Sequence, residues 1–187
     1  ANKEKINWEL LSKNPKAVSL LERNQEKIHW QVLSVNYGAV DLLKSNIDKI
    51  DWEMLSCNSS GAEIWNDPKH FDKIDWYFLS NNPGAIYILE TNKDKIDWSM
   101  LSSNSNAIPL LEKNPEKICW IEFSRNPNGI QILDANPEKI DWVMLSQNPN
   151  VEMLIDKYYK RFMLEALIDN IHIFEIDYDE IKKRIQP

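Results

Sequence analysis

The chain has 187 residues, of which 43% are hydrophobic and 10% aromatic, and its formal net charge is −7. This composition is sufficient for a packed core and excludes an intrinsically disordered chain. No apolar stretch reaches the roughly 18–20 residues that a membrane-spanning helix needs, and no secretory signal is recognisable, so we expect a soluble, intracellular protein without a membrane partner.

The negative charge is concentrated in the middle of the chain. Residues 48–148 carry nine basic and sixteen acidic side chains, whereas residues 1–47 carry seven basic and five acidic ones. An acidic middle repels phosphate backbones, so we do not expect a nucleic-acid partner. The basic excess in residues 1–47 keeps a repeat-based nucleic-acid reader open as a third alternative.

Tryptophan recurs along the chain at an almost constant spacing, with five intervals of 22 residues and one of 24. The surrounding repeat is N-P-E-K-I-D-W-x-x-L-S-x-N-P-x-A-I-x-L-L-E-x. A period of this length predicts a solenoid in which each repeat packs only on its neighbours. The structural tryptophans are Trp8, Trp30, Trp52, Trp76, Trp98, Trp120 and Trp142.

Each repeat contains two signals for the start of a helix. With tryptophan as position 0, asparagine occupies +6 in all seven repeats and proline follows it in four; asparagine caps a helix and proline suits its first position. A second asparagine at −6 marks another start, which predicts two helices of about nine or ten residues per repeat. The +6 asparagines are Asn14, Asn36, Asn58, Asn82, Asn104, Asn126 and Asn148.

The pattern therefore predicts an all-α fold, an α-solenoid of tandem short antiparallel helix pairs. The helix after +6 has a single apolar face. In the helix from −6, isoleucine at −2 and the apolar residue at +2 point one way, whereas tryptophan and leucine +3 point another, so we expect two buried faces. Position −1, mostly aspartate, is expected to bond a donor in the adjacent repeat. Serine at +4 is expected to bond carbonyls freed near the helix end, or the turn.

The run I-D-W-x-x-L-S-x-N-P-x-A-I-x-L-L-E-x-N-P-E-K resembles repeats found in many copies in large DNA viruses that infect amoebae. The resemblance covers roughly residues 2–150, and residues 173–184 are similar to the closing element of those proteins, which continues beyond the position of Pro187. It implies a protein-binding array of the ankyrin type, located in the host cytoplasm or the virion, and it carries over no catalytic residue.

Two regions depart from the pattern. Between Ser59 and Asp72 the third repeat is two residues longer, which is either a tolerated insertion or a functional loop. We place the seven-unit helical repeat array at residues 1–150 and a C-terminal helical cap at 151–187. The longer amphipathic helix of this cap contains Met153, Leu154, Tyr158, Phe162, Leu164, Leu167 and Ile168, and a final helix follows Asp177.

No motif for catalysis, metal binding or cofactor binding emerges, so we expect a non-enzymatic protein without a cofactor. Cys57 and Cys119 lie almost three repeats apart, too far for a disulfide, so we expect free thiols. Positions +1 and +5 vary on a constant frame, which reflects either recognition of a protein partner or drift of a solvated surface. The candidate binding stripe is Tyr77, Asn81, Tyr87, Ile121, Arg125, Val143 and Gln147.

Two functions follow from this sequence. The first is a repeat scaffold that mediates protein–protein interaction between virus and host. The alternative is a structural or assembly component that associates with itself through its uncapped N-terminal end, where the sequence has no counterpart of the C-terminal cap.

Overall fold

The computed structural model describes residues 6–158, and every element of regular secondary structure in this range is a helix. The chain divides into two compact units, Ala1–Asp97 and Trp98–Pro187. In both units, short helices contact one another in regular succession. The predicted all-α solenoid of helix pairs is therefore confirmed. No helix of the described range is long and apolar enough to cross a membrane.

One helix of each pair begins at the repeated tryptophan, and we call these the tryptophan helices. They pack on one another in sequence order: α1 on α3, α3 on α5 and α5 on α7 in the first unit, and α9 on α11 and α11 on α13 in the second. The tryptophan helices are α1 (Trp8–Lys13), α3 (Trp30–Ser34), α5 (Trp52–Ser56), α7 (Trp76–Ser80), α9 (Trp98–Ser103), α11 (Trp120–Ser124) and α13 (Trp142–Ser146).

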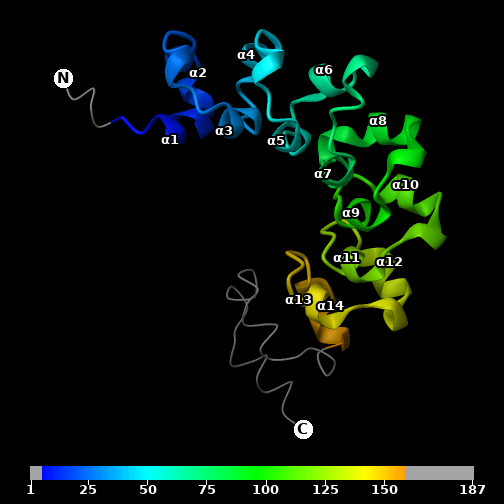
Figure 1. Ribbon diagram of the computed structural model, residues 1–187. Helices are drawn as coiled ribbons and strands as arrows, with labels where there is room; N and C mark the ends of the chain where they lie inside the picture. The colour runs from blue at the N-terminus through cyan, green and yellow to red at the C-terminus, as the bar shows by residue number, and fades with distance from the viewer. Residues whose placement is uncertain (1–5, 159–187) are drawn as a thin grey trace. The chain divides into compact units, whose positions relative to one another are not determined.

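The other helix of each pair, which we call the intervening helix, lies in a second layer. In the first unit, α1, α3 and α5 form one row and α2, α4 and α6 a second (Figure 1), and α4 packs on α6. The intervening helices are α2 (Val18–Glu22), α4 (Val40–Lys44), α6 (Ala62–Trp65), α8 (Ile86–Thr91), α10 (Ile108–Glu112), α12 (Ile130–Ala135) and α14 (Glu152–Tyr158).

The helix predicted to start at the −6 asparagine does not form as one helix. A single 3₁₀ turn follows this asparagine, and isoleucine −2 is then extended, with ψ between 119° and 131° in the five described repeats that have the asparagine. The chain turns into the tryptophan helix only after position −1. These 3₁₀ turns are η3 (Gln25–Lys27), η4 (Ile47–Lys49), η7 (Lys93–Lys95), η8 (Pro115–Lys117) and η9 (Pro137–Lys139), and in the third repeat η5 (Pro68–His70) follows Asp67 instead.

The −6 asparagine closes the preceding intervening helix instead of starting a new one. Its Nδ2 donates to the carbonyl oxygen four residues earlier, at 2.8–3.0 Å in all five repeats. The prediction of an N-cap here was wrong because an asparagine side chain can satisfy a freed carbonyl at a helix end as well as a freed amide at a helix start.

The +6 asparagine does cap the turn that follows it, as predicted. Its Oδ1 accepts the backbone N–H two residues later, at 2.9–3.0 Å in all seven repeats. In two repeats this turn is a 3₁₀ helix, η2 (Pro15–Ala17) and η6 (Pro83–Ala85).

The amide nitrogen of the same asparagine joins neighbouring repeats. In the first unit, Asn58 Nδ2 donates to the carbonyl oxygens of Ser34 and Asn36, at 3.0 and 3.1 Å. In the second unit, Asn126 Nδ2 donates to the carbonyl oxygens of Ser102 and Asn104, both at 2.9 Å. We call this row of bonds the asparagine ladder. Its asparagines are buried, whereas Asn14, in the first repeat, is exposed.

The +4 serine makes a second connection between repeats. Its Oγ donates to the tryptophan carbonyl of its own helix, as Ser34 does to Trp30 at 2.9 Å. The same oxygen accepts the backbone N–H of position −1 in the next repeat, as Ser34 does from Asp51 at 3.0 Å. This bond recurs for six serines: Ser12, Ser34, Ser56, Ser80, Ser102 and Ser124.

The side chain at −1 does not reach the adjacent repeat, contrary to our prediction. The carboxylates of Asp51, Asp75 and Asp141 accept the N–H of position +2 in their own tryptophan helix, at 2.9–3.1 Å. His29 and Cys119 make no such side-chain cap. The backbone amide of position −1 makes the described bond to the preceding repeat whichever side chain it carries, which explains why the side chain at −1 varies.

The repeated tryptophans lie at half-buried positions beside the core, which is formed by leucine +3 and the intervening helices. The lysine at −3 of the following repeat lies over the ring, as Lys27 does over Trp8 at 4.9 Å and Lys49 over Trp30 at 4.7 Å. Cation–π contacts of this kind contribute about 0.5–1 kcal/mol each at exposed sites. The contact is described for four tryptophans, Trp8, Trp30, Trp52 and Trp120, and in these places it joins a repeat to the next one.

The two irregular regions are partly described. In the third repeat, His70 is buried, and the centre of its ring lies 4.8 Å from that of Trp52. Trp65, in the same irregular segment, is also buried. After residue 150, Val151, Leu154 and Ile155 are buried and continue the pattern of the intervening helices. The predicted cap residues Phe162, Leu164, Leu167 and Ile168, and the final helix after Asp177, lie outside the described residues.

Candidate functional site

The tryptophan helices leave one side open. At about 100° per residue, position 0 and positions +3 and +4 lie on one arc of the helix, and positions +1, +2 and +5 lie on the opposite arc. The core takes +3 and +4, so the other three positions remain accessible. We call positions +1, +2 and +5 of the tryptophan helices the open face.

In the first unit, the open face of α1, α3 and α5 contains a groove of about 310 Å³. Positions +2 of the three successive helices line it, together with the +1 and +5 residues of the first two. The lining residues are Glu9, Leu10, Lys13, Gln31, Val32, Val35 and Met54.

Position +2 is the part of this face that sequence analysis missed. We predicted that +2 and isoleucine −2 share a buried face, but −2 lies in the extended segment before the helix, so helical periodicity does not relate the two. Isoleucine −2 is buried in most repeats, whereas Leu10 is 66% exposed and Val32 and Met54 are half-buried. The exposed leucine and the half-buried valine and methionine, all at position +2, form an apolar row.

The predicted stripe falls into three groups in the structure. In the first unit, Tyr77 lies on α7 and Asn81 directly follows this helix. The centre of the Tyr77 ring lies 5.3 Å from that of Phe78, in an edge-on arrangement. Ile121, Arg125, Val143 and Gln147 lie on or directly after α11 and α13 in the second unit. Tyr87, which is 72% exposed, lies on the intervening helix α8 and therefore not on the open face.

The open face of the second unit is also apolar. Ile121 and Val143 are 53% and 42% exposed, and Met100 and Met144 are half-buried at position +2. An ion pair joins Arg125 Nη2 to Glu122 Oε2 at 2.7 Å, so its charges largely compensate each other.

Carboxylates surround the open face at α5. The Cys57 thiol has its pKa raised above the ordinary value, first by burial and then by the negative charges of Glu53, Asp75 and Asp51. The thiol is therefore protonated and a poor nucleophile at neutral pH. Both cysteines are free, as predicted.

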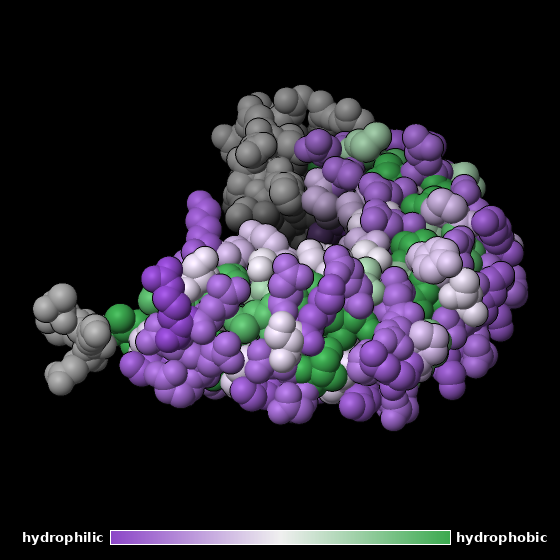
Figure 2. All heavy atoms as spheres, turned by 90° about the horizontal axis from the view of Figure 1, so that it is seen from above, coloured by the Kyte–Doolittle hydropathy of each residue, from purple (hydrophilic) through white to green (hydrophobic). Residues whose placement is uncertain are grey.

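The opposite side of the first unit has a different character. Figure 2 looks onto the intervening helices, and hydrophilic side chains cover most of what it shows of them. A hollow of about 240 Å³ on this layer is lined by two lysines and two carboxylates beside His70. Lys44 pairs with Glu63, and Lys69 pairs with Asp67, so the charges in this hollow compensate each other.

Comparison with protein-family models, curated proteins and solved structures finds no match to this chain. The resemblance to repeats of amoeba-infecting viruses therefore stays a prediction. Within residues 6–158, no group of three or more His, Cys, Asp or Glu side chains is placed to hold a metal ion. The open face is the surface from which function can be argued.

Proposed function

We propose that this chain is a non-enzymatic repeat scaffold whose open face binds a protein partner. The observation that carries the proposal is the exposure of Leu10, Tyr77, Ile121 and Val143 on tryptophan helices whose +3 neighbours are almost all fully buried. In the second unit, Ile121 and Val143 occupy position +1 of successive tryptophan helices, and exposed apolar patches mark interaction sites. Tyrosine and methionine are favoured at interfaces because they supply large contact areas.

The resemblance to viral repeats makes a host protein the first partner to look for, and the two free thiols fit an intracellular location. Affinity capture from a lysate, followed by mass spectrometry, tests the proposal. The bait is the chain itself beside a triple variant in which Tyr77, Ile121 and Val143 are each changed to serine.

The control is a second triple variant with serine at Tyr37, Tyr87 and Met153, which are 63%, 72% and 65% exposed away from the open face. A partner retained by the control and lost from the first variant supports the open face. A partner lost only from the control would place binding on the other surface. Equal capture by all three baits would contradict the proposal.

A second candidate function is self-association through the first repeat. Leu20 is 39% exposed, whereas Leu42 at the equivalent position of the next repeat in the same unit is 5% exposed. Asn14, likewise, makes no described bond through its amide nitrogen, although its counterparts join the asparagine ladder. A further hollow, of about 240 Å³, lies here against Ile6, Trp8 and Leu20.

A second copy that covers this surface would bury the apolar side chains and bond the amide. Sedimentation over a range of concentrations checks this function. We expect a dimer that the substitution Leu20→Glu abolishes. If the chain and the variant are both monomers at all concentrations, self-association is excluded and binding of a partner by the open face remains as the proposed function.

A further inference from the structure

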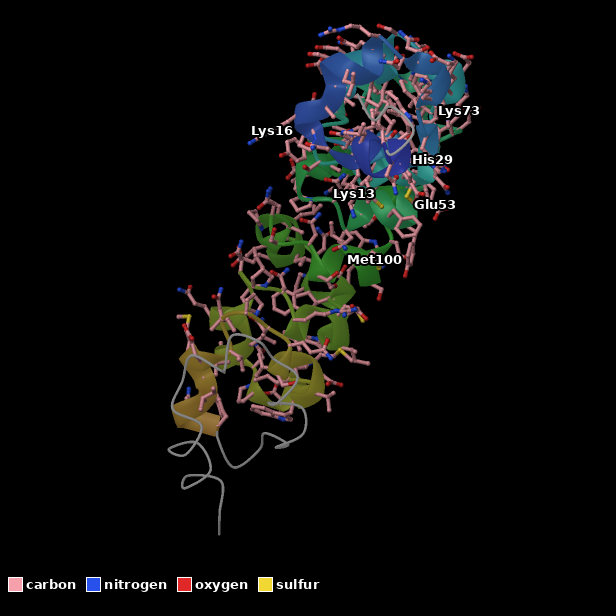
Figure 3. The ribbon with its side chains drawn as sticks, turned by 90° about the vertical axis from the view of Figure 1, so that its left-hand side faces the viewer. Lys13, Lys16, His29, Glu53, Lys73 and Met100 are labelled. Atoms are coloured by element: carbon pink, nitrogen blue, oxygen red, sulfur yellow. The ribbon has the colours of Figure 1, made fainter. Side chains whose placement is uncertain are left out.

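The groove over α1, α3 and α5 has a charge pattern that restricts what can occupy it. Glu9 and Gln31 line it at position +1 of α1 and α3, and Glu53 occupies the same position of α5, next to the lining residue Met54. The Asp51 and Asp75 carboxylates add negative charge near Cys57. Among the open-face positions of these three helices, Lys13 is the sole cation. In Figure 3, Lys13 and Glu53 lie lower in the view than Lys16 and Lys73.

The floor of the groove is apolar and adaptable. Leu10, Val32 and Met54 occupy the same position of three successive helices, and Val35 lies beside them. Adjacent helices pack about 8–10 Å apart, so these floor residues can meet apolar side chains spaced along an elongated segment. A groove of about 310 Å³ is at the small end of ligand sites, which span roughly 300–1,000 Å³. It therefore suits a few side chains of a larger partner.

We propose that this groove binds a protein segment whose apolar side chains are accompanied by lysine or arginine. The inference rests on the proposed function and deepens it by giving the chemistry of the partner. Apolar side chains of the segment pack on Leu10, Val32 and Met54, and its cations face Glu9 and Glu53. Met54 adapts to side chains of different shape because it is unbranched and polarisable.

Other occupants fit the same charges poorly. Nucleic acid and acidic peptides would bring negative charge against the glutamates. A second copy of this chain carries the same net charge of −7, so its approach to this groove meets repulsion.

Fluorescence anisotropy with three labelled peptides tests the inference. The first is a leucine–lysine peptide patterned as an amphipathic helix, the second has glutamate in place of lysine, and the third has serine in place of leucine. We expect the first to bind to the chain and the other two to bind at least about tenfold more weakly. Binding should weaken as salt is raised, because the charges are exposed.

Charge variants assign the binding to the groove. Each reversal replaces an attraction to the peptide's cations by a repulsion, so Glu9→Lys combined with Glu53→Lys should weaken the binding of the leucine–lysine peptide about tenfold. Lys13→Glu should tighten its binding. Glu22→Lys, which makes one such charge reversal on the exposed surface of α2, is the control and should alter affinity less than about twofold.

Three results would overturn the inference: tighter binding of the leucine–glutamate peptide, no binding of the leucine–lysine peptide, or equal weakening by Glu22→Lys. Circular dichroism confirms that each variant folds. If the inference fails while the open-face serine variant still loses its captured partner, the proposed function stands with a partner of different chemistry. If both experiments fail, the open face is not a binding surface.

Discussion

The contribution of the asparagine ladder to stability can be predicted by comparing two asparagines of the first unit, Asn58 and Asn14. Asn58 is buried, caps its turn by accepting from Ser60 N–H at 3.0 Å, and donates to two carbonyl oxygens of the preceding repeat. Asn14, in the same unit, makes the equivalent cap to Lys16 N–H at 2.9 Å and no described bond to another repeat. Changing each to alanine therefore separates the cap from the ladder.

The magnitude follows from the bonds that each change removes. Loss of an asparagine cap costs about 0.5–2 kcal/mol, and this part is common to both variants. Asn58→Ala also leaves two buried carbonyl oxygens, those of Ser34 and Asn36, without this donor. An unsatisfied buried acceptor costs about 1–3 kcal/mol. Allowing for entry of water, we expect Asn58→Ala to lower the free energy of unfolding by about 2–4 kcal/mol more than Asn14→Ala does.

Urea denaturation followed by circular dichroism measures the two free energies of unfolding. A third variant, Asn58→Asp, keeps the oxygen that caps the turn but sets a carboxylate against the two carbonyls. It should cost at least as much as Asn58→Ala at neutral pH. Equal losses for the alanine variants of Asn58 and Asn14, or a harmless Asn58→Asp, would refute the view that the ladder holds the repeats together.

Three further predictions concern single positions. Cys119→Asp should stabilise the second unit by about 0.5–2 kcal/mol in thermal denaturation, because α11 lacks the side-chain cap that aspartate supplies in other repeats. Gly84→Ala should lower the melting temperature, because a Cβ there would overlap the Ser59 carbonyl oxygen, whereas alanine at the equivalent, exposed Lys16 should leave it nearly unchanged. Burial lowers the pKa of His70 below its ordinary 6.5, so the folded state takes up its proton at lower pH than the unfolded state. Stability should fall as the pH drops below 6.5, and His70→Phe should remove this part of the pH dependence.

The sequence was sufficient for those features that depend on local signals. The tryptophan spacing predicted the repeat, and the +6 asparagine with its proline predicted a capped helix start, of which the structure has the cap and a turn before a shorter helix. The −6 asparagine was misassigned because its amide can serve either end of a helix. The error propagated to position +2, which appeared buried only when −2 and +2 were placed on one continuous helix.

The contacts between repeats could not be predicted in the same way. Asn58 donates to backbone carbonyls, and Ser34 accepts from a backbone amide of the next repeat. Every residue type carries these backbone groups, so no side-chain pattern shows which of them meet. Their pairing depends on how one repeat stacks on the next. Glu9, Gln31 and Glu53 occupy the same repeat position in the sequence, but the groove beside them depends on the same stacking.

The described bonds of the asparagine ladder and of the −1 backbone amides run in one direction. The later repeat donates from its asparagine amide and its −1 backbone amide, and the repeat before it in the chain accepts. During synthesis the N-terminal repeats leave the ribosome first, so each new repeat meets a neighbour whose acceptors are already in place. Duplication of one repeat within the gene would likewise supply a matching donor and acceptor on its two sides. An array of this kind can lengthen by copying alone, without the invention of a new interface.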